Sequence, residues 1–316
     1  MAEATTMSDF ADWTPPDTDE LERLEALVER QLKAPDRPQL KLLGHGEVTI
    51  AIAHPSESPR WACKRMPPVA RRARAEAYAR HIERYVQALW DAGAAVLPSA
   101  CRIVRTHSGR FALYVIQPIV PAAGLAPNVL RARVPSADDT LLSAIFDSIC
   151  KASGPRLGVD GQLANWALVG DHPTQIDVTT PFTRDERGRP ELDTATVVAP
   201  YPGALRWVLK RWVVPDLLIK YHDPRSILLD FTANLIREDM QDWIPAAIAA
   251  ANRRTSPALT IDEVRAYYHE DAKLWEAIYQ VKKFYRDWLR ATGRTYQFLL
   301  QPPTTRDPMA AREVRS

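Results

Sequence analysis

The amino-acid sequence predicts an α+β fold in which a small antiparallel sheet with one helix precedes a larger, mainly helical region. Five short apolar segments between Pro35 and Val120 have the lengths and flanking turn residues of strands, and one long helical segment, from about Val69 to Ala92, interrupts them. From Ala122 onward, apolar residues recur at helical intervals. A chain of 316 residues with 46% apolar content can bury one large core or two moderate lobes.

The chain opens with a polar arm, in which Phe10 and Trp13 are candidate anchors, and a helix follows. Asp17 and Glu20 have the spacing of a capping box, and leucine and valine then recur at helical intervals through Lys33. We expect this helix to pack on the domain that follows.

The remaining boundaries follow from the same patterns. Strands are predicted at Leu40 to Leu43, Val48 to His54, Trp61 to Met66, Cys101 to Thr106 and Phe111 to Val120. Ser136 and Asp139 have cap spacing before a helix that ends at Gly154. Further helices are predicted at 203–221, 224–253, 261–269 and 271–291, with Pro215 and Pro245 kinking or breaking two of them. The predicted domains are an arm and helix at 1–34, a small lobe at 35–120, a helical lobe at 121–301 and a disordered tail at 302–316.

Charge, cysteine content and the absence of known motifs exclude several classes of protein. A net charge of +2 gives no reason to expect nucleic acid as the main partner. Cys63, Cys101 and Cys150 form no CxxC pair, so we expect buried thiols in a reducing compartment. No apolar run is long enough for a membrane span, and the N-terminus lacks a signal sequence, which predicts a soluble cytoplasmic protein. The HExxH and GxSxG motifs of zinc and serine hydrolases are absent.

The segment from Leu157 to Phe182 is the stretch around which we expect a functional site. It contains two short apolar segments, Trp166 to Val169 and Ile176 to Val178, separated by the polar turn Gly170-Asp171-His172-Pro173. This pattern predicts a β-hairpin.

Asp160, Asn165 and Asp177 would be held close together by this hairpin. The set suits phosphoryl transfer, in which one carboxylate takes the proton of an acceptor hydroxyl while an amide oxygen and a second carboxylate hold Mg²⁺ against phosphates. The alternative is that Asp-Gly is a common turn and that the other two are ordinary loop residues.

A glycine-containing turn, Gly44-His45-Gly46-Glu47-Val48-Thr49, joins the first two predicted strands. Because it joins two strands rather than a strand and a helix, it is not a dinucleotide-binding fingerprint. Its glycines would let backbone N–H groups approach the phosphates of a nucleotide. The alternative is a hairpin turn that needs positive φ.

Lys64 is a single cation in the apolar strand Trp61-Ala62-Cys63-Lys64, and a lone ammonium there needs an anion such as the phosphates of a nucleotide. The following helix offers Glu76 and Glu83, seven residues apart on one face, as partners, and we prefer Glu76. Several arginines in this helix make a solvated face the alternative for both glutamates.

The order of these features resembles the protein-kinase-like fold, and more closely the bacterial small-molecule kinases of the aminoglycoside-phosphotransferase type. The resemblance covers about residues 39 to 182 by motif, and the later helices match only in general character. It implies a two-lobed fold, with a five-stranded antiparallel sheet and one helix in a small N-lobe and a larger, mainly helical C-lobe. It also implies ATP and Mg²⁺ as cofactors.

In the N-lobe, the resemblance implies that Gly44, Gly46 and Thr49 cover the phosphates, that Lys64 holds them and that Glu76 orients Lys64. Adenine would meet the segment from Ile116 to Ile119. The residues that would offer it backbone hydrogen bonds are Gln117 and Ile119.

In the C-lobe, the resemblance implies that Asp160 is the catalytic base and that Asn165 and Asp177 are the metal ligands. The chain departs from the family pattern at two places. Gly158-Val159 stands where the family has His followed by Gly or Arg, and no Gly follows Asp177.

These features predict an ATP-dependent phosphotransferase that acts on a hydroxyl of a small molecule or of a peptide Ser or Thr, as a monomer or homodimer. The alternatives are a nucleotide-binding pseudokinase or scaffold and a kinase-like nucleotidyltransferase.

Two later segments have open interpretations. Ala204 to Tyr221 combines four cations with Trp207 and Trp212, which indicates either a membrane-surface or acidic-substrate face or, as we prefer, a C-lobe helix with snorkelling cations. A second segment carries a polar set that would line an acceptor pocket or, as we prefer, form salt-bridged packing. Its members are Arg225, Asp230, Asn234, Arg237 and Glu238.

Overall fold

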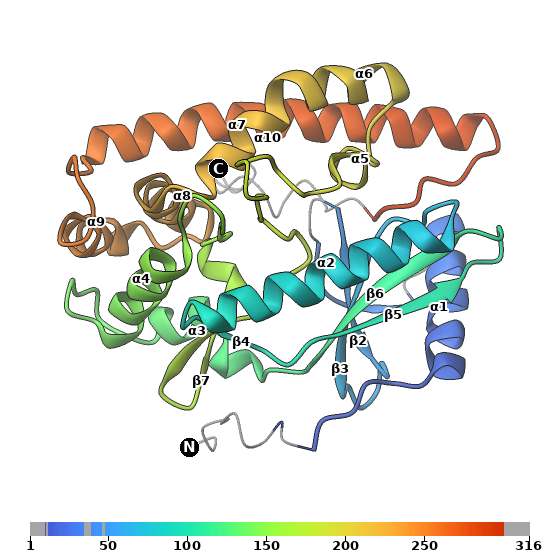
Figure 1. Ribbon diagram of the computed structural model, residues 1–316, viewed down its shortest axis with the longest axis horizontal. Helices are drawn as coiled ribbons and strands as arrows, with labels where there is room; N and C mark the ends of the chain where they lie inside the picture. The colour runs from blue at the N-terminus through green and yellow to red at the C-terminus, as the bar shows by residue number, and fades with distance from the viewer. Residues whose placement is uncertain (1–9, 11, 35–38, 46–47, 300–316) are drawn as a thin grey trace, which may run out of the picture.

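The computed structural model describes residues 10, 12–34, 39–45 and 48–299, and it confirms the predicted α+β class. A five-stranded antiparallel sheet with two helices forms the N-terminal part, and a mainly helical part follows (Figure 1). This arrangement is consistent with a two-lobed kinase-like fold. Most of the predicted arm and all of the predicted tail lie outside the described residues.

The five predicted strands are all present, each within a few residues of its predicted limits. They run in the order β1-β2-β3-β6-β5, and every neighbouring pair is antiparallel. Their bounds are β1 Lys41–His45, β2 Ile50–His54, β3 Trp61–Arg65, β5 Ala100–Arg105 and β6 Phe111–Pro118.

One face of this sheet is covered by α1 (Thr18–Lys33), as predicted for the first helix. The side chain of Asp17 caps α1 by accepting a hydrogen bond from the N–H of Glu20 at 2.8 Å. Side chains alternate along a strand, so Cys63 on β3 faces α1 while its neighbour Lys64 faces the other side. Cys63 is buried, the other two cysteines are half-buried, and all three thiols are free.

The opposite face of the sheet packs against α2 (Arg72–Asp91), the single long helix predicted between the strands. Its buried stripe has helical spacing and consists of Ala75, Tyr78, Ala79, His81, Ile82, Tyr85 and Leu89. This stripe joins the large core that continues into the helical part, so α2 links the two regions.

A second, three-stranded sheet contains the predicted hairpin. It is formed by β4 (Ala95–Val96), β8 (His172–Gln175) and β7 (Trp166–Val169), with β8 in the middle. The predicted second hairpin strand, Ile176 to Val178, is therefore wrong, because β8 ends at Gln175. The reason is a tight turn in which Gly170 adopts a φ of 60° and Val169 pairs with His172.

The C-terminal part is built mainly from helices. They are α3 Ala126–Arg131, α4 Thr140–Ala152, α5 Thr194–Val197, α6 Gly203–Val208, α7 Val214–Lys220, α8 Pro224–Arg237, α9 Ile244–Asn252 and α10 Ile261–Ala291. Short 3₁₀ turns occur at Ala122–Gly124, Leu163–Asn165 and Gln241–Trp243. In the described part of the chain, no helix combines the length and the apolarity needed to cross a bilayer.

The predicted interruptions near Pro215 and Pro245 are both present, and one predicted helix boundary is wrong. The helix at 203–221 is interrupted by the π-helical turn η4 (Leu209–Val213), which ends two residues before Pro215, a residue without an N–H for the helical ladder. The helix at 224–253 is two helices, and Pro245 lies in the first turn of α9, where no N–H is needed. The boundary predicted between 261–269 and 271–291 is wrong, since both segments belong to the single helix α10 and no breaker lies between them.

Candidate active site

Lys64 of β3 contacts the C-terminal part of the protein. It extends from β3 toward the segment that follows β8, where its Nζ donates a hydrogen bond to the carbonyl of Ile176. The same Nζ lies 3.2 Å from Oδ1 of Asp177, and the lysine side chain is only 12% exposed. The structure therefore brings together two predicted site residues that are far apart in the sequence.

The predicted partnership of Lys64 with Glu76 is wrong in this structure. Glu76 forms an ion pair with Arg72 at 2.9 Å, and its side chain is 41% exposed. Glu83 is also exposed. The physical reason is the rotation of α2, which points its apolar stripe at the sheet and both glutamates outward. Among the described residues, Asp177 is the ion-pair partner of Lys64.

Two tyrosines of α2 contact the site loops instead. The hydroxyl of Tyr78 donates to the carbonyl of Thr179 at 3.0 Å, and that of Tyr85 donates to the carbonyl of Gly158 at 2.9 Å. Both tyrosines are buried. The sequence signal for them was available, because two tyrosines seven residues apart in an apolar stripe each need an acceptor for the hydroxyl.

Asp177 is held as a carboxylate. Burial alone would raise its pKa, but the Lys64 ammonium together with the N–H and hydroxyl of Thr179 lowers the pKa below the usual value. Thr179 donates from its backbone N at 3.0 Å and from Oγ1 at 2.8 Å, both to Oδ1. Within the described part of the chain, no hydrogen bond or ion pair engages Oδ2 of Asp177, so this oxygen is available to a ligand.

Asp160 has the opposite electrostatic surroundings. Burial and the neighbouring carboxylates of Asp230 and Asp177 raise its pKa to about 7. Lys220 and the backbone N–H of Gln162, which donates to Asp160 at 3.3 Å, oppose this shift. The group can thus accept or release a proton near neutral pH.

Asn165 contacts Asp160 and the residue that precedes Asp177. Its Nδ2 lies 3.4 Å from the carbonyl oxygen of Asp160, and its own carbonyl accepts the N–H of Ile176 at 2.9 Å. The predicted grouping of Asp160, Asn165 and Asp177 around the hairpin is therefore present, together with Lys64.

The predicted Mg²⁺ ligands fit the ion in chemistry but do not complete a site. One carboxylate and one amide supply the oxygen donors that Mg²⁺ prefers, and the ion commonly takes its remaining ligands from phosphates and water. In the described ranges, no group of three or more His, Cys, Asp or Glu side chains is placed to hold a metal ion. The oxygens of Asn165 and Asp177 thus fit a metal that arrives with a phosphate ligand.

A buried polar network lies beside Asp160. Asp230 of α8 is 1% exposed and accepts hydrogen bonds from Lys220 Nζ at 2.7 Å and from the hydroxyl of Tyr267 at 2.8 Å. Gln162 Nε2 lies 3.5 Å from the same carboxylate. Sequence reasoning placed Asp230 in a polar set but did not connect Lys220 or Tyr267 to the site.

Other charged members of that polar set form salt-bridged packing, the interpretation we preferred. Their ion pairs are Arg225 with Glu263, Arg237 with Asp271 and Glu238 with Arg131. Asn234 donates to the carbonyl of Asp230 within α8. Asp230 is itself ion-paired with Lys220 at 2.7 Å, so it also fits the salt-bridged interpretation.

Gly158 lies two residues before Asp160, and its surroundings explain the glycine. A Cβ at this position would lie 2.6 Å from the carbonyl oxygen of Tyr221 and 3.0 Å from Nδ1 of His222. The imidazole of His222, from the segment between α7 and α8, thus lies where a larger side chain at 158 would have to fit. Burial lowers the pKa of His222, which favours the neutral ring.

The predicted nucleotide-binding turn is only partly described. Gly44 lies on β1 opposite Ala51, and a Cβ there would meet nothing within 4 Å. Thr49 is buried. Gly46 lies outside the described residues.

The predicted backbone donors to adenine already have partners. The N–H of Ile119 donates to the carbonyl of Arg60 at 3.3 Å. Further along the same pair of strands, the N–H of Met66 donates to the carbonyl of Leu113 at 2.8 Å. Hydrogen-bonded pairs alternate in an antiparallel ladder, so the intervening Ala62–Gln117 pair is hydrogen-bonded as well. The backbone N–H groups of Gln117 and Ile119 therefore face β3 in this conformation.

The fold and the site define a two-part α+β protein in which a lysine of the sheet meets two aspartates and an asparagine of the helical part. The chain belongs to a family of unknown function, DUF6206, whose model matches residues 23–286. No curated protein matches the chain.

Among solved structures, the chain is similar to one titled "WaaP in complex with acyl carrier protein". The match has a TM-score of 0.36 and 14% sequence identity, and it covers 83% of this chain and 96% of the other. At these values the likeness supports no statement about function.

Proposed function

We propose that this protein is an ATP-dependent phosphotransferase that moves the γ-phosphoryl group of Mg·ATP to a hydroxyl of a small molecule or of a peptide Ser or Thr. The observation that supports the proposal is the meeting of Lys64 with Asp177 beside Asp160 and Asn165. Positioning and charge stabilisation are the main protein contributions to phosphoryl transfer.

Lys64 and Asp177 have complementary roles in this proposal. Lys64 supplies the cation that holds the nucleotide phosphates, and Gly44, Gly46 and Thr49 cover them. Asp177, with its lowered pKa and available Oδ2, would hold Mg²⁺ together with the amide oxygen of Asn165. When bound, Mg²⁺ would neutralise charge on the transferred phosphoryl group.

Asp160 aligns the acceptor hydroxyl and takes its proton. Its pKa of about 7 suits this role, because a general base works best when its pKa is close to the working pH. Asp230, beside it, accepts hydrogen bonds and is a candidate contact for the acceptor. Adenine would meet the segment from Ile116 to Ile119, and a contact with the N–H of Ile119 requires its 3.3 Å hydrogen bond to Arg60 to open.

Calorimetry of Mg·ATP binding tests the nucleotide site. Lys64→Ala should weaken binding roughly tenfold or more, since a charge-assisted contact contributes about 1.5–3 kcal/mol. Lys41→Ala is the matched control, because Lys41 is an exposed lysine of β1. Equal ATP affinity in wild type and Lys64→Ala would overturn the assignment.

Turnover with pooled hydroxyl acceptors tests the chemistry. Asp160→Asn should lower phosphoryl transfer by about 10²- to 10⁴-fold and leave ATP affinity nearly unchanged. Mass spectrometry of the product distinguishes an added phosphoryl group from a nucleotidyl group. ATP binding without transfer to any acceptor would instead support a pseudokinase.

Thermal unfolding tests the metal ligand. With ATP present, Mg²⁺ should raise the melting temperature of the wild type, because a ligand that binds only the native state stabilises it. Asp177→Asn should lose this Mg²⁺-dependent increase. If the increase persists in full, another residue holds the metal.

A further inference from the structure

The helical segment α6–η4–α7 exposes a row of large apolar side chains. Trp207 is 69% exposed and Trp212 is 61% exposed, and Val208 and Ile219 continue the row along the same segment. We call these four residues the Trp207–Ile219 strip. The opposite side of the segment is already used, since Leu209, Val214 and Leu218 are buried in the main core. The strip is therefore a second apolar surface that the fold itself does not need.

Cations without acidic partners accompany the strip. Lys210 and Arg211 are exposed, and the guanidinium of Arg211 lies 4.8 Å from the ring centroid of Trp212. Neither cation forms an ion pair with an acidic side chain in the part of the chain that the structure describes. The other two cations of this segment are already engaged, because Lys220 is ion-paired with Asp230 and Arg206 donates to the carbonyls of Tyr201 and Ala199. The surface therefore complements a negatively charged partner.

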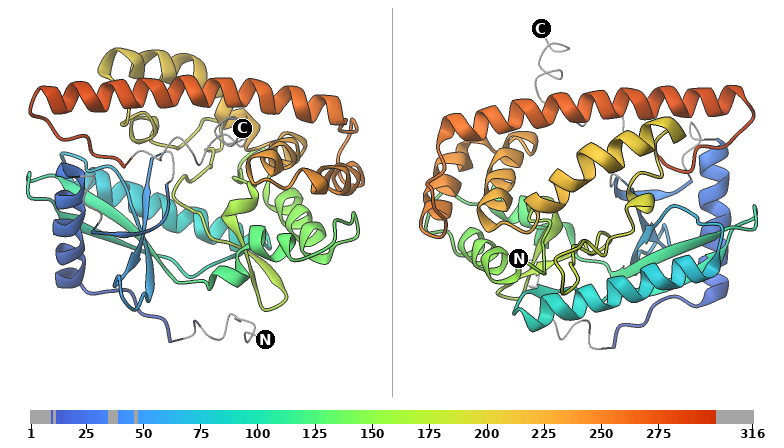
Figure 2. Two further views of the ribbon diagram at one scale, coloured as in Figure 1. Left: turned by 180° about the vertical axis from the view of Figure 1, so that it is seen from behind. Right: turned by 45° about the horizontal axis from the view of Figure 1, so that its top comes forward.

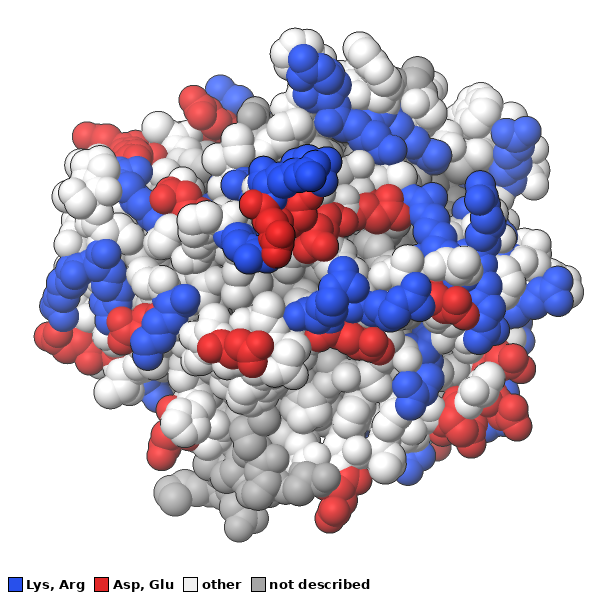
Figure 3. Space-filling model, viewed as in Figure 1, with Lys and Arg blue, Asp and Glu red and all other residues white. Residues whose placement is uncertain are grey.

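The strip lies at the outside of the molecule. In Figure 1 and in the left view of Figure 2, α6 lies beside α10 at the edge farthest from the five-stranded sheet, and in the right view, where the top comes forward, α6 lies below α10. Figure 3 shows Lys and Arg without Asp or Glu between them at the top, where Figure 1 places α6. A flat, extended partner can reach this edge without contacting the candidate active site.

We propose that the Trp207–Ile219 strip is a docking surface for an anionic lipid bilayer. A helix with tryptophan and aliphatic side chains beside Lys and Arg has the composition of helices that lie in the membrane interface. Tryptophan is favoured at the level of the lipid headgroups, and each nearby cation adds attraction to anionic lipid. The protein then binds at the bilayer surface through α6–η4–α7 without spanning it.

Sedimentation with lipid vesicles tests the proposal on the full chain. The wild type should bind vesicles of phosphatidylcholine with phosphatidylglycerol, bind pure phosphatidylcholine weakly, and be released by added salt. Lys210→Gln and Arg211→Gln should each weaken binding about fivefold. The double variant Trp207→Ser/Trp212→Ser should bind vesicles more weakly still. Vesicles with brominated acyl chains should quench a smaller fraction of the tryptophan fluorescence of this double variant than of the wild type.

The matched control is Trp90→Ser, which removes an exposed tryptophan from α2, outside the strip. It should bind vesicles as the wild type does. Circular dichroism establishes that each variant is folded. Three outcomes would overturn the proposal: no vesicle binding by the wild type, unchanged binding by folded strip variants, or a dimer in solution that the strip variants dissociate while vesicle binding is absent.

Discussion

Asp160 and Asp177 show how neighbouring carboxylates acquire different protonation behaviour from their surroundings. Asp160 is half-buried near Asp230 and Asp177, and its pKa rises to about 7. Asp177 is also half-buried, but Lys64 and Thr179 contact its Oδ1 and lower its pKa. Two carboxylates whose pKa values are pushed apart suit two roles, one as a proton acceptor and one as a permanent anion.

The first prediction concerns the pH dependence of stability. The folded pKa of Asp160, about 7, exceeds the ordinary value of 3.8, so the native state holds a proton that the unfolded chain has already released. Stability should therefore fall as pH rises between these values. Asp160→Asn has no such carboxyl group and does not show this loss. The free energy of unfolding of Asp160→Asn minus that of the wild type, measured with urea, should therefore increase by a few kcal/mol from about pH 5 to about pH 8.

Asp177→Asn is the control of opposite sign. A lowered pKa contributes stability that is present at neutral pH and is lost only in acid, below the ordinary value of 3.8. Asp177→Asn should therefore be less stable than the wild type by the same amount at about pH 5 and at about pH 8. A constant difference for Asp160→Asn as well would show that its pKa is not raised.

The second prediction concerns Gly158. Gly158→Ala should destabilise the protein by about 1–3 kcal/mol, because its Cβ would lie 2.6 Å from a backbone carbonyl that cannot easily move. Gly154→Ala, where a Cβ meets nothing within 4 Å, is the matched control and should be nearly neutral. Urea unfolding of both variants measures the difference, and equal stabilities would contradict the packing around Gly158.

At the scale of the element, α2 joins the sheet to the site loops through hydroxyl groups rather than through an ion pair. Tyr78 and Tyr85 donate to carbonyls beside the two aspartates, whereas Glu76 lies on the exposed side with Arg72. A helix can present only one face to the sheet, so a choice of the tyrosine face excludes the glutamate face. α2 thus directly contacts the loops that carry Asp160 and Asp177.

The third prediction follows from this orientation. Tyr85→Phe should destabilise the protein by about 1–3 kcal/mol, because the buried carbonyl of Gly158 loses its donor. Glu76→Ala should cost less than about 1 kcal/mol and leave ATP affinity unchanged, since its ion pair is exposed. Unfolding by urea and ATP calorimetry check both statements. An affinity loss in Glu76→Ala as large as in Lys64→Ala would restore the originally predicted pair.

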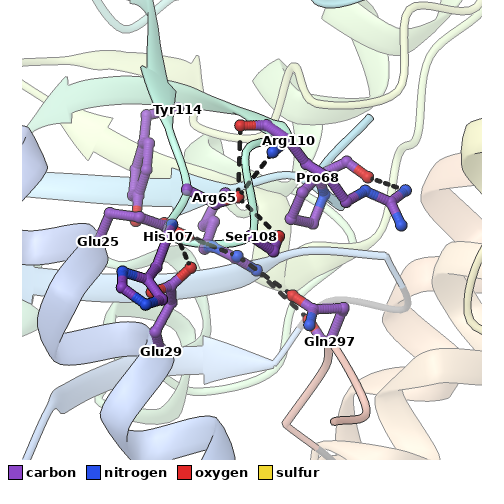
Figure 4. Close-up of polar contacts among 10 residues, drawn as sticks. Glu25, Glu29, Arg65, Pro68, His107, Ser108, Arg110, Tyr114 and Gln297 are labelled. Atoms are coloured by element: carbon purple, nitrogen blue, oxygen red, sulfur yellow. Dashed lines mark hydrogen bonds and ion pairs between the residues drawn. The ribbon is translucent and has the colours of Figure 1, made fainter. Parts of the chain in front are cut away.

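At the scale of the whole molecule, one buried ion pair joins three distant segments (Figure 4). Arg65 of β3 contacts both carboxylate oxygens of Glu25 on α1, at 2.7 and 2.8 Å, and both side chains are almost fully buried. The hydroxyl of Tyr114 donates to the same carboxylate at 2.6 Å, and Arg65 also donates to the carbonyl of Gln297 at 3.3 Å. These contacts attach α1 and the segment after α10 to the sheet.

The fourth prediction concerns this ion pair. Arg65→Leu should cost about 3–5 kcal/mol, because it leaves the buried carboxylate of Glu25 without its cation. The double variant Glu25→Leu/Arg65→Leu should be more stable than Arg65→Leu alone, since no uncompensated charge remains. Arg72→Ala, which breaks an exposed pair, is the control and should cost less than about 1 kcal/mol in urea unfolding.

Much of the fold was predictable because its signals are local. Alternating and helical apolar spacing identified all five strands of the main sheet and α2, and Asp17 and Asp139 cap helices where capping spacing predicted them. The grouping of Asp160, Asn165 and Asp177 was also predictable, because a short hairpin keeps residues that are near in sequence near in space.

The sequence by itself therefore determined the order of the five strands and of α2 in the N-terminal part and which residue types meet at the hairpin. Only the tertiary structure decided that Lys64 pairs with Asp177, that α2 turns its tyrosines inward and that His222 fills the space beside Gly158. It also decided that the N–H of Ile119 faces Arg60. These contacts depend on helix rotation and strand register, which are set by packing between distant segments rather than by the local spacing of residues.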